Sequence, residues 1–387
     1  MDTGLIASRL FAFAADGIPC EELKIEQIDY PALYKFSKTH SIVNTVCYAL
    51  EKLNMLPEEY AAPFRRELKI GRAREAVQEL ELEEISAQLE SRGIKYMPLK
   101  GSVMKHLYPR PDLRSMCDLD IEYDKSRKNE LDEIMLPLGY EVAEVSCTDG
   151  VNIAYRKKPF MYIEFHGVLM DTDIPLYNAY FGTDFERTVP DEGCRVKYTD
   201  EDFFVFMAAH LAKHYFLGGT GLRSLADIWL FLRKKPGLDS KYIFQELKKI
   251  RLDEFIKIII GVNYVLFEGK APDETQKSVI SYILGSGTYG TTENRSADNV
   301  KNQSKLKYLL GRFFPDREFM AINYPAVRKC ALLLPLFWVI RLVSTFFKKG
   351  YKGSDVDLVM NVSSAQIDAR KIPGNPTENN GERMNEL

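Results

Sequence analysis

Two aspartates separated by a single residue are the first feature that suggests chemistry. Asp118 and Asp120 lie in the segment Cys117–Tyr123, in which polar and apolar residues alternate with the period of a strand. Side chains two residues apart on a strand point to the same side, so the two carboxylates repel each other unless a cation lies between them. Carboxylate oxygens are ligands that suit Mg²⁺. For an isolated Asp-x-Asp, the alternative is an exposed strand edge with two solvated aspartates.

Upstream, a Gly-Ser pair strengthens the cation hypothesis. Gly101 and Ser102 stand between a short strand-like run and a short helix candidate. Such a turn presents backbone N–H groups and the positive end of a helix dipole, which together bind phosphate. Lys100 and Arg114 can supply positive charge nearby, although an isolated basic residue is more often a solvated surface charge.

A third carboxylate comes from a later strand. In the run Met161–His166, Glu164 and Tyr162 share one face, and apolar residues take the other. If this strand lies near the strand of Asp118, three carboxylates converge and can hold two divalent cations. Two such cations grip a nucleoside triphosphate and stabilise an in-line displacement at phosphorus.

The surrounding pattern predicts an α+β unit between helical regions. Strand-like runs occupy 94–99, 117–123, 140–145, 152–156 and 161–166, with helix candidates at 102–108 and 126–136 between them. Longer amphipathic patterns predict helices at 58–92, 200–216, 222–234, 239–250 and 252–268. We therefore expect an N-terminal helical region (1–93), an α/β core (94–198), a C-terminal helical domain (199–350) and a disordered tail (351–387).

Composition excludes several classes of protein and partner. The chain has 387 residues, with 52 basic and 55 acidic side chains and a formal net charge of −3. This balance argues against a long nucleic acid as partner, which selects for a basic excess, but allows a small phosphate pocket. Six cysteines without a C-x-x-C pair favour reduced thiols, and the N-terminus lacks a basic signal-peptide region. We expect a cytoplasmic protein.

One apolar stretch near the C-terminus needs a separate interpretation. Residues 331–347 are mostly apolar, contain Arg341 and are followed by two lysines. This is close to the lower limit of a membrane span, and an internal arginine disfavours one. A buried helix is the first interpretation, and an interfacial helix giving weak membrane-surface contact through 331–349 is the alternative.

Taken in order, these residues resemble a bacterial family described as uncharacterised nucleotidyltransferases. That family lies within the DNA-polymerase-β-like superfamily, whose signature is a Gly-Gly or Gly-Ser turn, an Asp-x-Asp and a later strand carboxylate. The resemblance covers roughly residues 30–345. The matching positions are Leu99-Lys100-Gly101, Tyr108-Pro109, Arg114, Asp118-Leu119-Asp120, Glu164-Phe165-His166, His210, His214, Arg223 and Asp227.

The resemblance implies a fold, a reaction and a set of roles. The fold would be α+β, a small nucleotidyltransferase-type mixed sheet with flanking helices. The reaction would move an NMP from an NTP, with ATP as first choice, to a hydroxyl of an unidentified acceptor (small molecule, sugar or protein) with release of pyrophosphate. Asp118, Asp120 and Glu164 would bind two Mg²⁺ ions, with Mn²⁺ as the alternative, and Asp120 or Glu164 would accept the hydroxyl proton.

The phosphates would be held at the Gly-Ser turn. Gly101 and Ser102 would contact them, helped by Lys100 or Arg114. A catalytically silent nucleotide-binding or protein-interaction module on the same fold is the alternative to an enzyme. The sequence also departs from the family pattern. Relative to the superfamily signature, Lys100 stands where a bulky apolar residue is usual, and the spacing of Ser102 to Asp118 is long. Relative to the bacterial family, Gly167 stands where an aromatic residue is common.

The remaining polar residues allow more than one role. His210 and His214 share a helix face and could form polar core contacts, contact nucleotide or acceptor, or bind zinc. Arg223 and Asp227 are spaced for a helix-surface ion pair, or for closing the site from the helical domain. His166 points to the same side as Glu164, where it could support the metal site, approach the acceptor hydroxyl or serve the structure alone.

Overall fold

A mixed five-stranded sheet forms the middle of the chain, which confirms the expected α+β class. The computed structural model describes residues 2–146, 150–170, 174–182, 185–288, 333–338, 369 and 372–375. The strands are β1 (Tyr96–Pro98), β2 (Leu119–Tyr123), β3 (Glu141–Val145), β4 (Ile153–Lys157) and β5 (Met161–His166). Their order across the sheet is β1-β2-β5-β4-β3, with β2 and β5 parallel and every other pair antiparallel.

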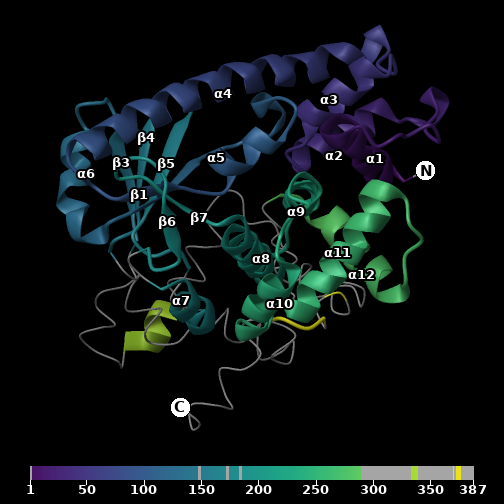
Figure 1. The fold of residues 1–387 in the computed structure, drawn as a ribbon. Helices are drawn as coiled ribbons and strands as arrows, with labels where there is room; N and C mark the ends of the chain where they lie inside the picture. Colours follow the sequence, from purple (N-terminus) through teal and green to yellow (C-terminus); the bar gives the residue numbers. More distant parts are fainter. Residues whose placement is uncertain are drawn as a thin grey trace.

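The two faces of the sheet differ in polarity as the alternation predicts. Leu119, Ile121, Ile163 and Phe165 are buried in one apolar cluster on the first face. Helices α4 (Glu58–Ser91) and α6 (Lys128–Met135) contribute to the same cluster, and α4 crosses this side of the sheet in Figure 1. The acidic residues of β2 and β5 therefore point to the opposite face.

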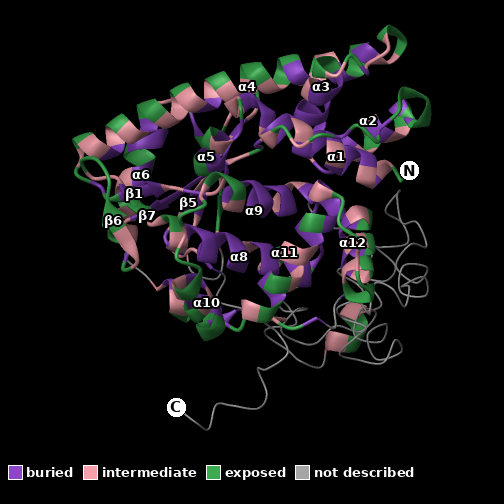
Figure 2. Ribbon diagram, turned by 45° about the vertical axis from the view of Figure 1, so that its right-hand side comes forward, coloured by how far each residue is buried: buried purple, intermediate pink, exposed green. Residues whose placement is uncertain are grey.

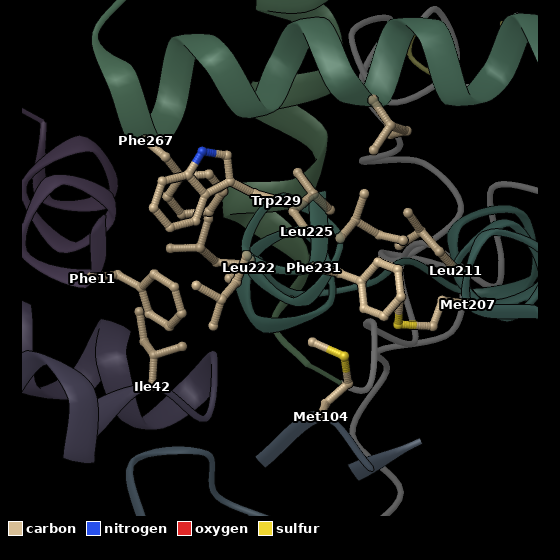
Figure 3. Close-up of a cluster of buried hydrophobic side chains, with 14 of the residues drawn as sticks. Phe11, Ile42, Met104, Met207, Leu211, Leu222, Leu225, Trp229, Phe231 and Phe267 are labelled. Atoms are coloured by element: carbon tan, nitrogen blue, oxygen red, sulfur yellow. The ribbon is translucent and has the colours of Figure 1, made fainter. Parts of the chain in front are cut away.

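The helices before and after the sheet share a single apolar core. Helices α1 (Thr3–Asp16), α2 (Tyr30–Thr39) and α3 (Val43–Lys52) precede α4. After the sheet come α8 (Asp200–Leu217), α9 (Leu222–Lys234), α10 (Ser240–Lys249), α11 (Asp253–Glu268) and α12 (Glu274–Ser286). Figure 3 shows Phe11 of α1 near Trp229 of α9 and Phe267 of α11, with Met104 reaching the same cluster. Helix α9 packs against α1 on one side and α8 on the other, and most of α8 and α9 is buried (Figure 2).

Short elements join the sheet to this helical core. A four-residue helix, α5 (Gly101–Met104), follows β1, and short 3-10 helices continue the connection at Lys105–Leu107 and Pro111–Leu113. Another 3-10 turn, Lys125–Arg127, leads into α6. Beyond β5, the chain passes through α7 (Pro175–Phe181) and the hairpin of β6 (Thr188–Pro190) and β7 (Val196–Tyr198) before α8 begins. A further 3-10 turn, Ile25–Gln27, precedes α2.

Several expectations concern the C-terminal part of the chain. The polar segment 285–305 is predicted as a loop, but its first two residues, Gly285 and Ser286, end α12, and the segment lies outside the described residues beyond 288. Most of 331–349 also lies outside them, with 333–338 described. No helix among the described residues has the length and apolar character needed to cross a membrane. In the expected tail, Ala369 is buried and its carbonyl accepts a hydrogen bond of 2.6 Å from Tyr215, so this point is packed. The rest of 351–387, apart from 372–375, is outside the described residues.

Candidate active site

A cavity of about 440 Å³ lies between the polar face of the sheet and helices α8 and α9. We call its two sides the sheet wall and the helix wall. The sheet wall includes Asp118, Asp120, Tyr162, Glu164 and His166. The helix wall includes Phe206, Met207, His210, Lys213, His214, Arg223 and Asp227. Lys100, Gly101 and Arg114 line the cavity between them.

Asp120 is the most enclosed of the three predicted carboxylates. The side chain keeps only 7% of its surface exposed. One of its oxygens, Oδ1, accepts from Lys100 Nζ at 2.7 Å and lies 2.8 Å from His166 Nε2. Burial by itself raises the pKa of Asp120, but the charge of Lys100 and the contact with His166 outweigh it and hold this pKa well below its usual range.

The parallel pairing of β2 and β5 brings Glu164 beside Asp120. These two residues are direct register partners, and His166 Nε2 lies 3.6 Å from Glu164 Oε2. One ligand atom from each of Asp120, Glu164 and His166 lies within 4.8 Å of the others, which is a spacing that a single ion can bridge. Two carboxylates suit Mg²⁺ or Mn²⁺, and an added imidazole suits Mn²⁺ better than Mg²⁺. The residues present therefore fit a divalent cation.

Asp118 occupies a different position from the one expected. The strand begins at Leu119, so Asp118 precedes it, and its oxygens are not part of the compact group formed by Asp120, Glu164 and His166. It nevertheless lines the same cavity. Burial and the charge of Asp120 raise the pKa of Asp118, and the same two causes raise the pKa of Glu164. A cation between these carboxylates would relieve that repulsion.

The turn after β1 is held by an unusual backbone conformation. Lys100 has φ 49° and ψ −109°, which a residue with a side chain rarely adopts. Next to it, Gly101 packs so closely that a Cβ would collide with Met116 Sδ and Arg114 Nη1. Within the described part of the chain, the Gly101 amide donates to no acceptor. Glycine is therefore required here by packing against Met116 and Arg114, and its N–H stays without a partner among the described residues at the edge of the cavity.

Ser102 and Arg114, both predicted to hold phosphate, are placed differently. Ser102 is buried and does not line the cavity, and its hydroxyl has no hydrogen-bond partner among the described residues. Arg114 lines the cavity but is paired with Asp227 of α9 through Nε at 3.2 Å and Nη2 at 2.7 Å. Its remaining nitrogen, Nη1, is the atom next to Gly101 and makes no hydrogen bond to any described residue.

The expected pair between Arg223 and Asp227 is wrong, because Asp227 has a different partner. Asp227 receives the fork of Arg114 and a hydrogen bond of 2.9 Å from Tyr108. Arg223 instead donates to the carbonyl of Ser115 at 2.9 Å and lines the cavity. The i, i+4 spacing gave no sign of this tertiary contact, which joins the segment before β2 to the helix wall.

The two histidines of α8 face the cavity together. Their Nε2 atoms are 3.1 Å apart, and both residues line the helix wall. Burial, with the charge of Lys100 as the next cause, lowers the pKa of His210 well below its usual value. No third metal-type ligand joins this pair among the described residues, because the candidate metal group found there is Asp120, Glu164 and His166.

Sequence reasoning left some residues of the site out. Glu144 and Lys213 line the cavity and were not named from the sequence. Tyr162, which also lines it, and Tyr108, which supports Arg114 through Asp227, were named but given no role. The alternation in β5 did indicate that Tyr162 faces the cavity, because Tyr162 and Glu164 are two residues apart on the strand and therefore share a face. Glu144 and Lys213 come from β3 and α8, and only the tertiary arrangement brings them to the cavity.

Comparison with known proteins identifies the family. No curated protein matches this chain, and no solved structure matches it. A family model described as "Uncharacterised nucleotidyltransferase" matches residues 26–267. This range is more than half of the chain, and it contains the β2–β5 carboxylates, the turn at Gly101 and helices α8 and α9. The chain belongs to this nucleotidyltransferase family.

Proposed function

We propose that this protein is a divalent-metal-dependent enzyme that transfers an NMP from an NTP to a hydroxyl of an acceptor, with release of pyrophosphate. Family membership supports the general reaction class. The observation that carries the finer proposal is the register pairing of Asp120 with Glu164, with ligand atoms of Asp120, Glu164 and His166 within 4.8 Å. This group opens into a cavity that also contains Lys100, Gly101 and Arg114.

The carboxylates supply the ligands of the metal. Asp118, Asp120 and Glu164 would hold Mg²⁺, with Mn²⁺ as the alternative. When bound, the ion would polarise the α-phosphate and offset charge that develops in the displacement. His166 keeps Asp120 in place through its contact at 2.8 Å. Glu164 is better placed than Asp120 to accept the proton of the attacking hydroxyl, since its carboxylate is 35% exposed.

Phosphate binding is assigned to the turn after β1. Gly101 offers an N–H that donates to no acceptor among the described residues, and Arg114 Nη1 lies beside it. Lys100 adds positive charge at the same edge of the cavity. Ser102, which is buried behind the turn, would support the turn's conformation rather than reach the nucleotide with its hydroxyl. ATP is the first nucleotide to test, and the acceptor is a small molecule, a sugar or a protein.

The test is pyrophosphate release from each NTP in the presence of Mg²⁺ and a pool of candidate acceptors. Asp118→Ala/Asp120→Ala should abolish release. Glu141→Ala is the matched control, because Glu141 is an exposed acidic residue of β3 outside the cavity, and it should leave the rate unchanged. Release that survives the double substitution contradicts the assignment. Nucleotide binding without release under any condition favours the catalytically silent module.

A further inference from the structure

The ammonium group of Lys100 lies directly on the proposed metal site. Its Nζ is 2.7 Å from Asp120 Oδ1, and the same oxygen is 2.8 Å from His166 Nε2. The lysine stands at the position where the superfamily signature usually has a bulky apolar residue. The inference drawn from this contact rests on the proposed function, because it concerns the cations of the same site.

The backbone holds Lys100 in this position from both sides. Its carbonyl accepts from Val103 at 3.2 Å and from Met104 at 2.9 Å, which anchors it to the first turn of α5. The preceding amide, that of Leu99, donates to the backbone carbonyl of Asp120 at 2.9 Å. The turn and β2 are thus bonded at the same residue that the lysine side chain contacts. The backbone therefore holds the Lys100 ammonium against the sheet wall.

An ammonium at this place changes how many cations the carboxylates can hold. A Mg²⁺ ion sits about 2.0–2.1 Å from a ligand oxygen. An ion on Asp120 Oδ1 would therefore lie close to Lys100 Nζ, and the two positive charges would repel each other. The other oxygen of Asp120 accepts no hydrogen bond from the described residues, and the carboxylate of Glu164 is 35% exposed, so an ion on these two groups need not displace the lysine.

We propose that Lys100 takes the place of one of the two divalent cations expected from the sequence, so that this site binds a single divalent ion. The ion is held by Asp120 and Glu164, with Asp118 at the edge of the cavity. Three carboxylate charges are then balanced by one ammonium and one divalent ion. Two divalent ions together with the lysine would leave the nucleotide-free site positively charged.

A different role for Lys100 makes a different prediction. If the lysine serves only as a phosphate ligand, its ammonium leaves Asp120 when nucleotide binds. Loss of its charge then weakens nucleotide binding, but it does not create a second ion site. The number of bound ions separates the two roles without any measurement of turnover.

The experiment counts Mn²⁺ ions bound to the full-length protein without nucleotide, by electron paramagnetic resonance during a titration. The wild type should bind one ion. Lys100→Met should bind two, and the pair should show the spin coupling of ions about 3.5–4 Å apart. Lys100→Arg keeps the charge and should bind one uncoupled ion. Lys69→Met, a change at an exposed residue of α4, is the control and should match the wild type.

Lys100→Gln provides a second neutral variant in case the methionine variant does not fold. Two ions in the wild type, or one ion in both neutral variants, would overturn the proposal. Two ions in a wild type that releases pyrophosphate would overturn this proposal and leave the proposed function standing. No ion bound to the wild type would also overturn the proposal, whereas the metal dependence of the proposed function is tested separately by pyrophosphate release with and without Mg²⁺.

Discussion

The two walls of the cavity hold their charges in different ways. On the sheet wall, Asp118, Asp120 and Glu164 crowd together, and burial and mutual repulsion raise the pKa of Asp118 and of Glu164. On the helix wall, Asp227 is matched by the two-pronged fork of Arg114 and by Tyr108. The sheet wall therefore carries an excess of negative charge. On the helix wall, the charge of Asp227 is already balanced by its partners.

The two walls therefore have different roles, one in function and one in structure. Converging carboxylates, two of which have raised pKa values, are an arrangement that a cation stabilises, as expected of a functional site. A bidentate arginine–carboxylate pair fixes geometry, and here it joins the segment before β2 to α9. We therefore expect substitutions on the sheet wall to reduce activity, and substitution of Asp227, which holds Arg114 from α9, to reduce stability.

The largest expected effect is on turnover. Asp120→Asn keeps the shape of the side chain but removes its charge, and we expect pyrophosphate release to fall at least ~100-fold, the range found when one preorganised electrostatic group is lost. The measurement is the initial rate with saturating NTP and Mg²⁺. Glu141→Gln on β3 should retain the wild-type rate. A variant at Asp120 with near-normal turnover would remove the sheet wall from catalysis.

The next effect is on the helix wall and concerns stability. Asp227→Asn leaves Arg114 buried without its charge partner, and we expect the free energy of unfolding to fall by ~3 kcal/mol. The two side chains are only 10% and 9% exposed. The measurement is urea denaturation of the wild type and the variant.

An exposed pair on the sheet gives the control for this prediction. Arg156 and Glu141 are 61% and 60% exposed, so Arg156→Met should change the free energy of unfolding by less than ~1 kcal/mol. Equal losses for the buried and the exposed pair would show that Arg114 and Asp227 do not hold the two regions together.

A third prediction concerns His40, which supports the helix wall from behind. Its Nδ1 accepts from the Leu222 amide at 3.0 Å, and its Nε2 lies 3.1 Å from the Leu284 carbonyl. Burial lowers the pKa of His40 to about 4. The folded pKa is depressed, so this contribution to stability is complete above pH 6.5 and is lost as pH falls toward 4.

The size of this effect follows from proton linkage. The shift from 6.5 to about 4 corresponds to ~3 kcal/mol, most of it lost by pH 4.5. We expect urea denaturation at pH 7 and pH 4.5 to show this loss in the wild type beyond that shown by His40→Asn. The asparagine can still accept from the Leu222 amide but cannot take up a proton in this range. Parallel pH profiles for the two proteins would contradict the prediction.

The local sequence pattern was sufficient to predict which side chains of β2 and β5 face the cavity. The alternation in β2 and β5 placed Ile121 and Phe165 on the core side and Asp120 and Glu164 on the polar side, and the structure confirms this division. Strand ends follow from pairing with neighbours, which a single sequence does not show. For this reason Asp118 was expected on the strand but lies just before it.

Contacts between distant segments could not be predicted in the same way. Arg114 and Asp227 are 113 residues apart, and no spacing rule links them. The i, i+4 rule favoured Arg223 as the partner of Asp227, but a buried carboxylate gains more from a bidentate fork than from a helix-surface pair. The burial of Ser102 likewise depends on how α5 packs against neighbouring segments, which the Gly-Ser motif does not encode.

The smallest effect tests whether the sheet wall lowers stability in return for function. Glu164→Gln removes one of the crowded charges and keeps the volume of the side chain. Because burial and Asp120 raise the pKa of Glu164, its ionised form is disfavoured in the folded protein. We expect the free energy of unfolding of the variant to rise by up to ~1 kcal/mol in the metal-free state, seen as a rise of a few degrees in Tm, while pyrophosphate release is lost.

Added Mn²⁺ should raise the Tm of the wild type more than that of the variant, since the wild type alone gains a cation between two carboxylates. A variant that is less stable than the wild type without metal would mean that Glu164 supports the fold, and the contrast between the two walls would then fail.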